Sequence, residues 1–201
     1  MVDILKQYVY IENISTNYLR IMNKKQILKL AETLGEMKAL KRQGWVRRKV
    51  KNPESDADHS YSLALLVMLF APKNLNLLKC MQLALVHDLP EIYCGDIVPG
   101  ELDLQKKFNL EAKAMQKVVQ DLECPQLQEL FMEYELRTTP EARFVWALDR
   151  LDNVFTAKKY EDAGHTGLVE EFAASARERI ECLEDDSLRE YLSQILDTLT
   201  A

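Results

Sequence analysis

Residues that interrupt helices are rare in this chain. Its 201 residues include 6 glycines and 6 prolines, so turns are scarce and a few long helices are favoured over many short strands. Apolar residues make up 47% of the sequence, enough to bury a hydrophobic core. No segment shows the alternation of apolar and polar residues that is typical of a half-buried strand. We therefore predict an all-α fold of about six to eight helices, in a single domain over residues 1–201.

Apolar spacing and capping residues indicate where the helices lie. Asn23 suits the N-cap of a first helix, which Gly44 is expected to end, and Thr139 with Pro140 suits the start of a helix that continues to about residue 160. Residues 1–23 are mixed, with room for a short helix. A helix at 56–70 is apolar nearly all round beyond Tyr61 and is expected to be buried, and a helix at 76–88 is also strongly apolar. The others are expected at 102–122, 125–137, 168–183 and 187–199, with loops at 49–55 and 89–100.

Charge and composition exclude several classes of partner. The net charge of −6 argues against a protein that coats DNA or RNA. The longest apolar run, residues 63–71, is about half of the ~20 residues that a membrane span needs. The first ten residues carry Asp3 and have no apolar secretory core. Without a C-x-x-C pair, the cysteines are expected to be reduced, which favours a cytoplasmic protein; they are Cys80, Cys94, Cys124 and Cys182.

A basic stretch lies between Lys38 and Lys51, with seven lysines and arginines and no acidic residue. Most of these side chains are expected to be solvated at a helix end and turn. Arg47 and Arg48 are the candidates for binding a small anion, because they lie beside Trp45 and close to the first histidine of the chain.

Four residues form a candidate metal site. A lone histidine on an apolar helix is usually a hydrogen-bonded core residue, which is the plainer interpretation of His59. Asp88 follows His87 at the end of an apolar helix, where the helix dipole disfavours a carboxylate and burial without a partner is costly. Asp149 also lies among apolar residues, and a salt bridge to Arg150 or Lys158 is the alternative for it.

Two imidazoles and two carboxylates from three helices suit one divalent cation with positions left for water. Mn²⁺, Co²⁺, Fe²⁺ and Mg²⁺ match this donor set better than a closed structural zinc site does. The identity of the ion, Zn²⁺ included, stays open at this point.

The order His59, His87-Asp88, Asp149 resembles the H…HD…D pattern of the HD-domain phosphohydrolases. The resemblance extends to Trp45 with Arg47-Arg48 and to the strings E-S-D-A-D-H-S, L-V-H-D-L-P-E and G-D-I, and covers about residues 44–160. These strings are similar to those of the HD-domain 5′-deoxynucleotidases and their eukaryotic relatives. The resemblance implies an all-α bundle, one divalent metal, hydrolysis of deoxyribonucleoside 5′-monophosphates, and a homodimer.

The resemblance also implies roles for further residues. Glu91 matches an acid/base or water-positioning glutamate, and Asp96 matches a second acidic residue at the substrate site. Trp45 matches an aromatic residue that packs against the nucleotide and helps to exclude a ribose 2′-hydroxyl. Where bacterial members place an arginine directly before this tryptophan, the chain has Gly44, so Arg47 or Arg48 is expected to supply that charge.

Residue chemistry agrees with a catalytic Glu91, since a carboxylate beside a metal can orient water or protonate a leaving oxygen. Taken alone, Glu91, Asp96 and Trp45 would be a helix-end carboxylate, a turn residue and a core-edge aromatic. Glu54 is expected to orient His59 or an arginine.

Two alternatives to a deoxynucleotidase remain open. The same metal site could act on a nucleoside triphosphate, a cyclic dinucleotide or a phosphorylated antimetabolite. The chain could instead be a non-catalytic module that binds a nucleotide and a metal.

Overall fold

The computed structural model describes residues 22–201, and this part of the chain is helical without any β-strand, which confirms the all-α prediction. Eight helices have ten or more residues, in agreement with the six to eight expected. Two short helices, α3 and α6, were not predicted. The helices are α2 (Lys24–Ala39), α3 (Gln43–Arg47), α4 (Asp56–Phe70), α5 (Leu77–Val86), α6 (Glu91–Cys94), α7 (Leu104–Leu122), α8 (Gln126–Leu136), α9 (Pro140–Asp162), α10 (Leu168–Glu181) and α11 (Asp186–Thr200).

Side-chain caps begin several helices where the sequence suggested. The Asn23 side chain accepts a hydrogen bond from the backbone N–H of Gln26, whose own side chain accepts from the Asn23 backbone N–H. Thr139 Oγ1 accepts from the backbone N–H of Ala142, with Pro140 in the first turn of α9. Each cap satisfies a backbone donor that the helix itself leaves free. The predicted N-caps Asn23 and Thr139 are therefore confirmed.

The prediction that Gly44 ends the first helix is wrong. α2 ends at Ala39, and Gly44 lies inside α3. The reason is a pair of backbone hydrogen bonds to the segment that precedes α4, in which the Arg42 N–H donates to the Glu54 carbonyl and the Asp56 N–H donates to the Leu40 carbonyl. These bonds hold residues 40–42 in an extended turn and so end α2 before Gly44 is reached.

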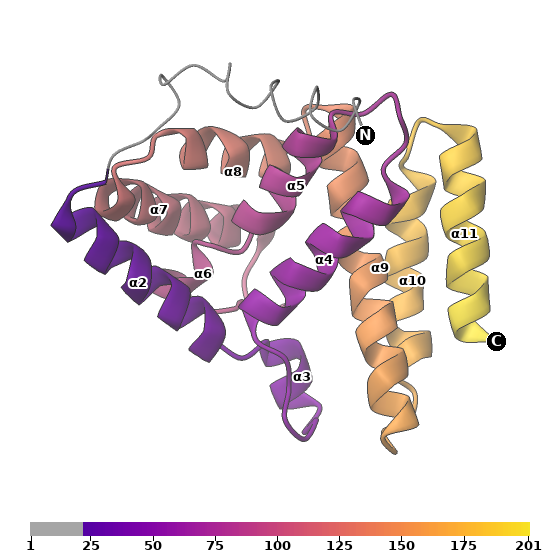
Figure 1. Ribbon diagram of the computed structural model, residues 1–201. Helices are drawn as coiled ribbons and strands as arrows, with labels where there is room; N and C mark the ends of the chain where they lie inside the picture. Colours follow the sequence, from indigo (N-terminus) through magenta and orange to yellow (C-terminus); the bar gives the residue numbers. More distant parts are fainter. Residues whose placement is uncertain (1–21) are drawn as a thin grey trace, which may run out of the picture.

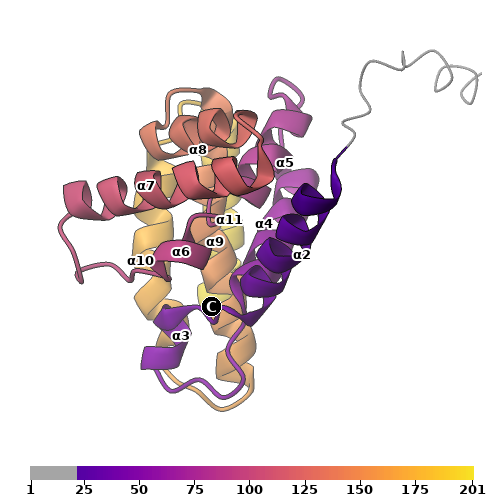
Figure 2. The same cartoon turned by 90° about the vertical axis from the view of Figure 1, so that its left-hand side faces the viewer.

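α9 is the central element of the fold. Twelve of its 23 residues are buried, and it packs against α4, α5, α8, α10 and α11. α10 and α11 run alongside it on one side, and α4 crosses it on the other (Figure 1). The view in Figure 2 shows α7 lying across the molecule with α6 directly beneath it, and α6 packs on α7 and α2. Residues carried by α4, α5, α6 and α9 are therefore brought toward one another inside the bundle.

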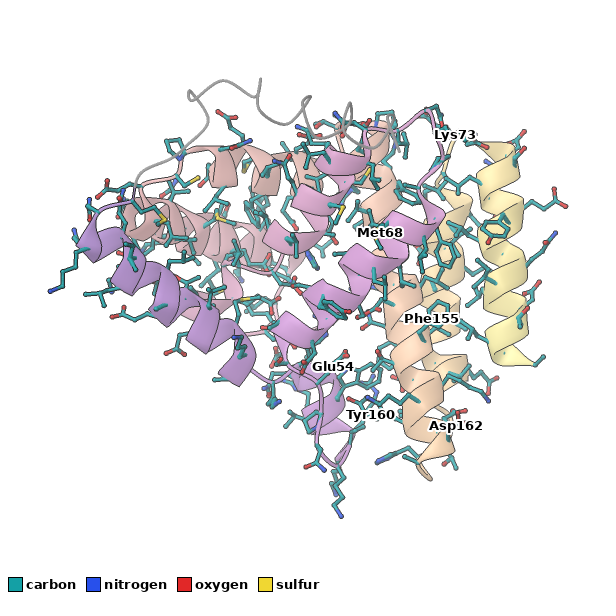
Figure 3. The ribbon with its side chains drawn as sticks, viewed as in Figure 1. Glu54, Met68, Lys73, Phe155, Tyr160 and Asp162 are labelled. Atoms are coloured by element: carbon teal, nitrogen blue, oxygen red, sulfur yellow. The ribbon has the colours of Figure 1, made fainter. Side chains whose placement is uncertain are left out.

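Helix α4 was expected to be buried and α5 to be strongly apolar, but both helices leave apolar side chains exposed. One face of each packs on the other helix and on α9, but no residue in 22–201 covers the opposite face. On α4, Leu69 is 64% exposed, and on α5, Leu78 is 67% exposed. Met68 is half exposed on the outer side of α4, where Figure 3 labels it. An apolar face of this kind can be covered by another chain, which the sequence of one chain does not reveal.

Two further expectations concern the ends and the membrane. The short helix expected within residues 1–23 falls almost wholly outside the described residues. Among residues 22–201, no helix is both long and apolar enough to cross a bilayer.

The cap of α9 gives a test of the fold. Thr139→Ala removes the hydroxyl that accepts from Ala142 and that also donates to Glu133 at 2.7 Å. We expect the variant to lose about 1–2 kcal/mol in the free energy of unfolding, measured by urea denaturation of the metal-free protein. Thr138→Ala is the matched control, because Thr138 is exposed and its side chain makes no hydrogen bond to any residue in 22–201. Equal stability of the two variants would contradict the assigned cap.

Candidate metal centre

The four predicted ligands lie together in the interior. His59 comes from α4, His87 is the C-cap residue of α5, Asp88 follows it, and Asp149 comes from the middle of α9. His59 Nε2 is 3.3 Å from His87 Nε2, 3.3 Å from Asp149 Oδ1 and 3.8 Å from Asp88 Oδ2. His87 Nε2 is 3.2 Å from Asp88 Oδ2. Three helices thus place four donor groups close to one point.

The orientation of the two imidazoles fits a cation. His59 Nδ1 lies 2.7 Å from Asp152 Oδ2, and His87 Nδ1 lies 2.9 Å from the Ala84 carbonyl oxygen. Both partners are acceptors, so in the neutral rings the proton is on Nδ1 and the Nε2 lone pairs face each other. Two lone pairs 3.3 Å apart beside two carboxylates repel unless a cation lies between them. His59, His87, Asp88 and Asp149 therefore have the chemistry to hold a divalent metal.

Without a metal, a proton can take the place of the cation. Burial opposes the charged form of His59, and the nearby Arg42 opposes it too, but hydrogen bonds to Asp149 and Asp152 raise the His59 pKa to about 10. The proton and a metal ion would occupy the same Nε2 atom. Metal binding at this site is therefore expected to compete with protonation.

Asp149 is held from two sides. Arg179 Nη1 donates to its Oδ2 at 2.6 Å, and the hydroxyl of Tyr134 donates to the same oxygen at 3.1 Å. Burial would raise the pKa of Asp149, but the charges of Arg150 and Arg179 outweigh burial and hold it well below the usual range. The salt bridge proposed as its alternative role involves neither Arg150 nor Lys158. The partner is Arg179, from α10.

The cation beside Asp88 is Arg42, which the sequence analysis did not single out. Arg42 Nη1 donates to Asp88 Oδ2 at 2.9 Å, and Nη2 is 3.4 Å from Asn153 Oδ1. Its Nε lies 3.7 Å from Glu54 Oε1. Burial would lower the pKa of the guanidinium, but the charge of Asp88 and of the other nearby carboxylates raises it instead. The turn between α2 and α3 thus delivers a fixed positive charge to the metal centre.

Arg47 and Arg48 do not line the cavity at this centre, contrary to expectation. Arg47 forms an ion pair with Glu101 on the surface. Arg48 pairs with Glu171 of α10 and lies over the ring of Phe172. Both arginines are on α3 or at its end, and their side chains point toward neighbouring surface elements. The basic stretch does supply an arginine to the site, but from the turn that precedes α3.

Trp45 is also placed differently from the prediction. Its side chain is 1% exposed and packs on Tyr160 and Phe172, with ring centroids 5.1 and 4.6 Å away. Its Nε1 donates to Glu54 Oε1 at 2.8 Å, and Figure 3 shows Glu54 and Tyr160 close together between the start of α4 and α9. Trp45 is therefore a core residue that fixes Glu54 beside Arg42, and it does not line the cavity. The expected role of Glu54 next to an arginine agrees with this geometry.

Asp56, Glu91 and Asp96 form a second group of carboxylates, with oxygen atoms within 4.8 Å of one another. Both oxygens of Asp56 and the Oε2 of Glu91 are buried and have no hydrogen-bond partner among the described residues, whereas Asp96 Oδ2 accepts from the Gln43 N–H at 2.5 Å. Burial, aided by Asp88, raises the pKa of Asp56 to about 7 and that of Glu91 well above its usual value. Arg42 Nη1 lies 4.0 Å from Asp56 Oδ1, and buried oxygens without a hydrogen bond could hold protons or a further divalent cation.

A cavity of about 660 Å³ opens from the metal centre. His87, Asp88, Asp149, Glu91 and Asp96 contribute to its wall, with Arg42 beside them. The cavity is closed elsewhere by apolar side chains and by further cations: Ile97, Pro99, Leu104, Phe108, Trp146, Lys107, Arg137, Arg150 and Arg179. Three of the four predicted ligands and the two predicted acidic residues therefore share one cavity, whereas His59 is fully buried and does not line it.

Four residues of this centre were missed by the sequence analysis: Arg42, Asp56, Asp152 and Arg179. Asp152 had a detectable signal, since it lies three residues after Asp149 and therefore on a neighbouring face of the same helix. Asp56 lies three residues before His59, where it resembles an ordinary acidic residue of a first helical turn. Nothing local distinguishes Arg42 or Arg179 from other surface arginines.

Comparison with known proteins places this geometry in a family. The model of the HD domain matches residues 34–184. The human protein named 5′-deoxynucleotidase HDDC2 is 37% identical over 154 residues, 74% of this chain and 75% of the human one. The PH0347 protein from Pyrococcus horikoshii OT3 has a solved structure with a TM-score of 0.73 and 34% identity, covering 86% of this chain and 97% of that one.

A more distant solved structure shares the fold. The HD phosphohydrolase DatZ of cyanophage S-2L, solved with dA and one catalytic Zn²⁺ ion, has a TM-score of 0.60 and 21% identity, over 90% of this chain and 99% of that one. The residues that the family model matches include His59, His87, Asp88 and Asp149. The chain belongs to the HD-domain family, as its sequence pattern indicated.

Proposed function

We propose that this protein is a divalent-metal-dependent phosphohydrolase that releases phosphate from deoxyribonucleoside 5′-monophosphates. The observation that carries the proposal is the pair of facing imidazole Nε2 atoms, 3.3 Å apart, with two carboxylates at the wall of a 660 Å³ cavity. A cavity of this volume lies within the range of small-ligand sites and can take a nucleotide. The names of the curated relatives, which are 5′-deoxynucleotidases in human and in Schizosaccharomyces pombe, support this substrate class.

In this proposal His59, His87, Asp88 and Asp149 hold the metal. When bound there, a divalent ion lowers the pKa of water and polarises a phosphoryl oxygen. Asp152 holds the proton of His59 on Nδ1, which keeps Nε2 free for the metal. Arg179 and Tyr134 fix the second oxygen of Asp149.

Glu91 is the proposed acid/base residue. Its Oε2 has no hydrogen-bond partner among residues 22–201 and lies in the same group as Asp56 and Asp96, whose charges add to burial in raising its pKa. A carboxyl group with a raised pKa keeps its proton to higher pH than an ordinary glutamate and can donate it to the leaving 5′-oxygen. Asp96 is proposed to bind the substrate beside it. Arg42, in place of Arg47 and Arg48, is the proposed cation beside Asp88 and Glu91.

We further propose a homodimer in the cytoplasm, built from one domain per chain over residues 1–201. The uncovered apolar faces of α4 and α5 support a second copy as their partner, since monomers rarely leave such patches open. The four cysteines, Cys80, Cys94, Cys124 and Cys182, are free thiols, which agrees with a reducing compartment. A small nucleotide, rather than a nucleic-acid polymer or a membrane, is the proposed partner of the cavity.

The proposed reaction is tested by measuring phosphate release from the deoxy- and ribonucleoside 5′-monophosphates. The assay is run in metal-free buffer and with Mn²⁺, Co²⁺, Fe²⁺, Mg²⁺ or Zn²⁺ added. We expect metal-dependent release of inorganic phosphate that favours the deoxy substrates. Release of triphosphate or pyrophosphate from a nucleoside triphosphate, without hydrolysis of monophosphates, would contradict the assigned substrate. A folded, metal-loaded protein with no turnover would favour a binding module.

Glu91→Gln separates catalysis from metal binding. The substitution keeps the shape of the side chain but removes the transferable proton, so we expect turnover to fall by about 10²- to 10⁴-fold while metal affinity changes little. Glu135→Gln is the control, because Glu135 lies on the cavity wall but outside the group of Asp56, Glu91 and Asp96. Steady-state phosphate release and metal titration are measured on both. Unchanged turnover in Glu91→Gln would remove this residue from the mechanism.

Metal affinity should depend on pH. In the metal-free protein the His59 pKa is raised to about 10, so below this pH the ring carries a proton that a metal must displace. We expect metal binding to release about one proton near pH 7 and affinity to rise with pH, levelling off only as pH approaches that value. Calorimetric titration in two buffers of different ionisation enthalpy measures the released protons. Binding without proton release would show that His59 is neutral before the metal arrives.

A further inference from the structure

Five cationic side chains line the cavity, and three of them are engaged by other residues. Arg42 is bound to Asp88, and Arg179 donates to Asp149 and to the Trp146 carbonyl. Lys107 pairs with Glu111 at 3.0 Å. Only Arg137 and Arg150 line the cavity without a hydrogen bond or ion pair from their side chain to any residue in 22–201. These two differ in their surroundings.

Arg150 is half-buried on α9, directly after the predicted ligand Asp149. It lies one helical turn after Trp146, so both side chains project from the same face of α9 into the cavity. Arg137 is instead exposed at the end of α8, where its guanidinium lies 5.0 Å from the centre of the Trp146 ring. Arg150 is thus the unpaired cation that lies nearest along the chain to the metal centre.

An unpaired guanidinium at this place is best explained by a ligand. It offers five N–H donors in a planar fork, and partial burial weakens their solvation. The charge of Arg150 helps to keep the pKa of Asp149 low, but the cation that donates to this carboxylate is Arg179, at 2.6 Å, so the N–H donors of Arg150 make no contact with it. The cavity also carries the carboxylates of Asp88, Glu91 and Asp96, which repel an anion. A dianionic phosphate would need a cation whose donors are free.

We propose that Arg150 binds the phosphate group of the substrate through its guanidinium fork. This proposal rests on the proposed function for the identity of the substrate. Arg150 would make a second cationic contact to the phosphate, in addition to Arg42. Arg42 alone would offer the phosphate too few hydrogen-bond donors, because its own N–H groups are directed at Asp88, Asn153 and Glu54. Arg150 can form two parallel N–H···O bonds to phosphate, as a bidentate arginine does.

The test measures the binding of inorganic phosphate to the Mn²⁺-loaded protein by calorimetry, in wild type and in Arg150→Met. We expect phosphate to bind at least about tenfold more weakly to Arg150→Met, since a charged hydrogen-bond partner is lost, while the Mn²⁺ dissociation constant stays the same. Arg150→Lys keeps the charge without the fork and should show a smaller loss. It also keeps the proposal testable if Arg150→Met does not fold. Lys159→Met is the matched control, because Lys159 is an exposed cation on the same helix and does not line the cavity.

The outcomes separate this proposal from the proposed function. Phosphate affinity equal in Arg150→Met and Lys159→Met would overturn the role of Arg150, as would a loss of Mn²⁺ affinity with phosphate binding unchanged at saturating Mn²⁺. If wild type hydrolyses no nucleotide, the proposed function fails, yet phosphate binding and its dependence on Arg150 are still measured. For an active enzyme, Arg150→Met should also weaken inhibition by phosphate and leave inhibition by the deoxynucleoside unchanged.

Discussion

Several carboxylates are buried close together in this protein, and the surrounding structure depends on positive partners for them. Asp56, Asp88, Glu91, Asp149 and Asp152 are all largely buried where α4, α5, α6 and α9 meet. Like charges at this separation cannot all be ionised in a protein interior without positive partners. Arg42 and Arg179 supply two such partners, and the raised pKa values of Asp56, Glu91 and His59 favour their protonated forms. A divalent ion would complete the neutralisation at the point where the donors converge.

The same helix carries the hydrophobic core and the charged centre. On α9, Leu148, Leu151 and Val154 are fully buried, and Asp149 and Asp152 lie between them. The apolar neighbours fix the helix rigidly against α4 and α10, and this fixes the two carboxylates relative to His59. The packing of α9 in the core therefore also determines where its metal ligand is placed. A cavity made at Leu148 would move the metal ligands as well as weaken the core.

Sequence patterns predicted the features that are local along the chain. Helix positions follow from apolar spacing and from caps such as Asn23 and Thr139, because both act within one or two turns. His59, His87, Asp88 and Asp149 could be selected because a charged or polar residue on a buried helix needs a partner. Arg42 could not be chosen over Arg47 and Arg48, since its contact with Asn153 joins residues 111 positions apart. Trp45 shows the same limit, because its indole could equally face a ligand or the core until Phe172 and Tyr160 were placed beside it.

The ion pairs of Arg47 and Arg48 are more sensitive to ionic strength than the ion pair at the metal centre. Arg47 ties α3 to Glu101 in the segment that also supplies Ile97 and Pro99 to the cavity, and Arg48 ties α3 to Glu171. These pairs are solvent-accessible, so dissolved salt screens them, whereas the Arg42–Asp88 pair is shielded in the interior. Added salt therefore weakens the contacts that tie α3 to Glu101 and to α10, and has less effect on the Arg42–Asp88 pair at the metal centre. The position of α3 and the arrangement of the metal centre therefore depend on interactions that differ in their response to ionic strength.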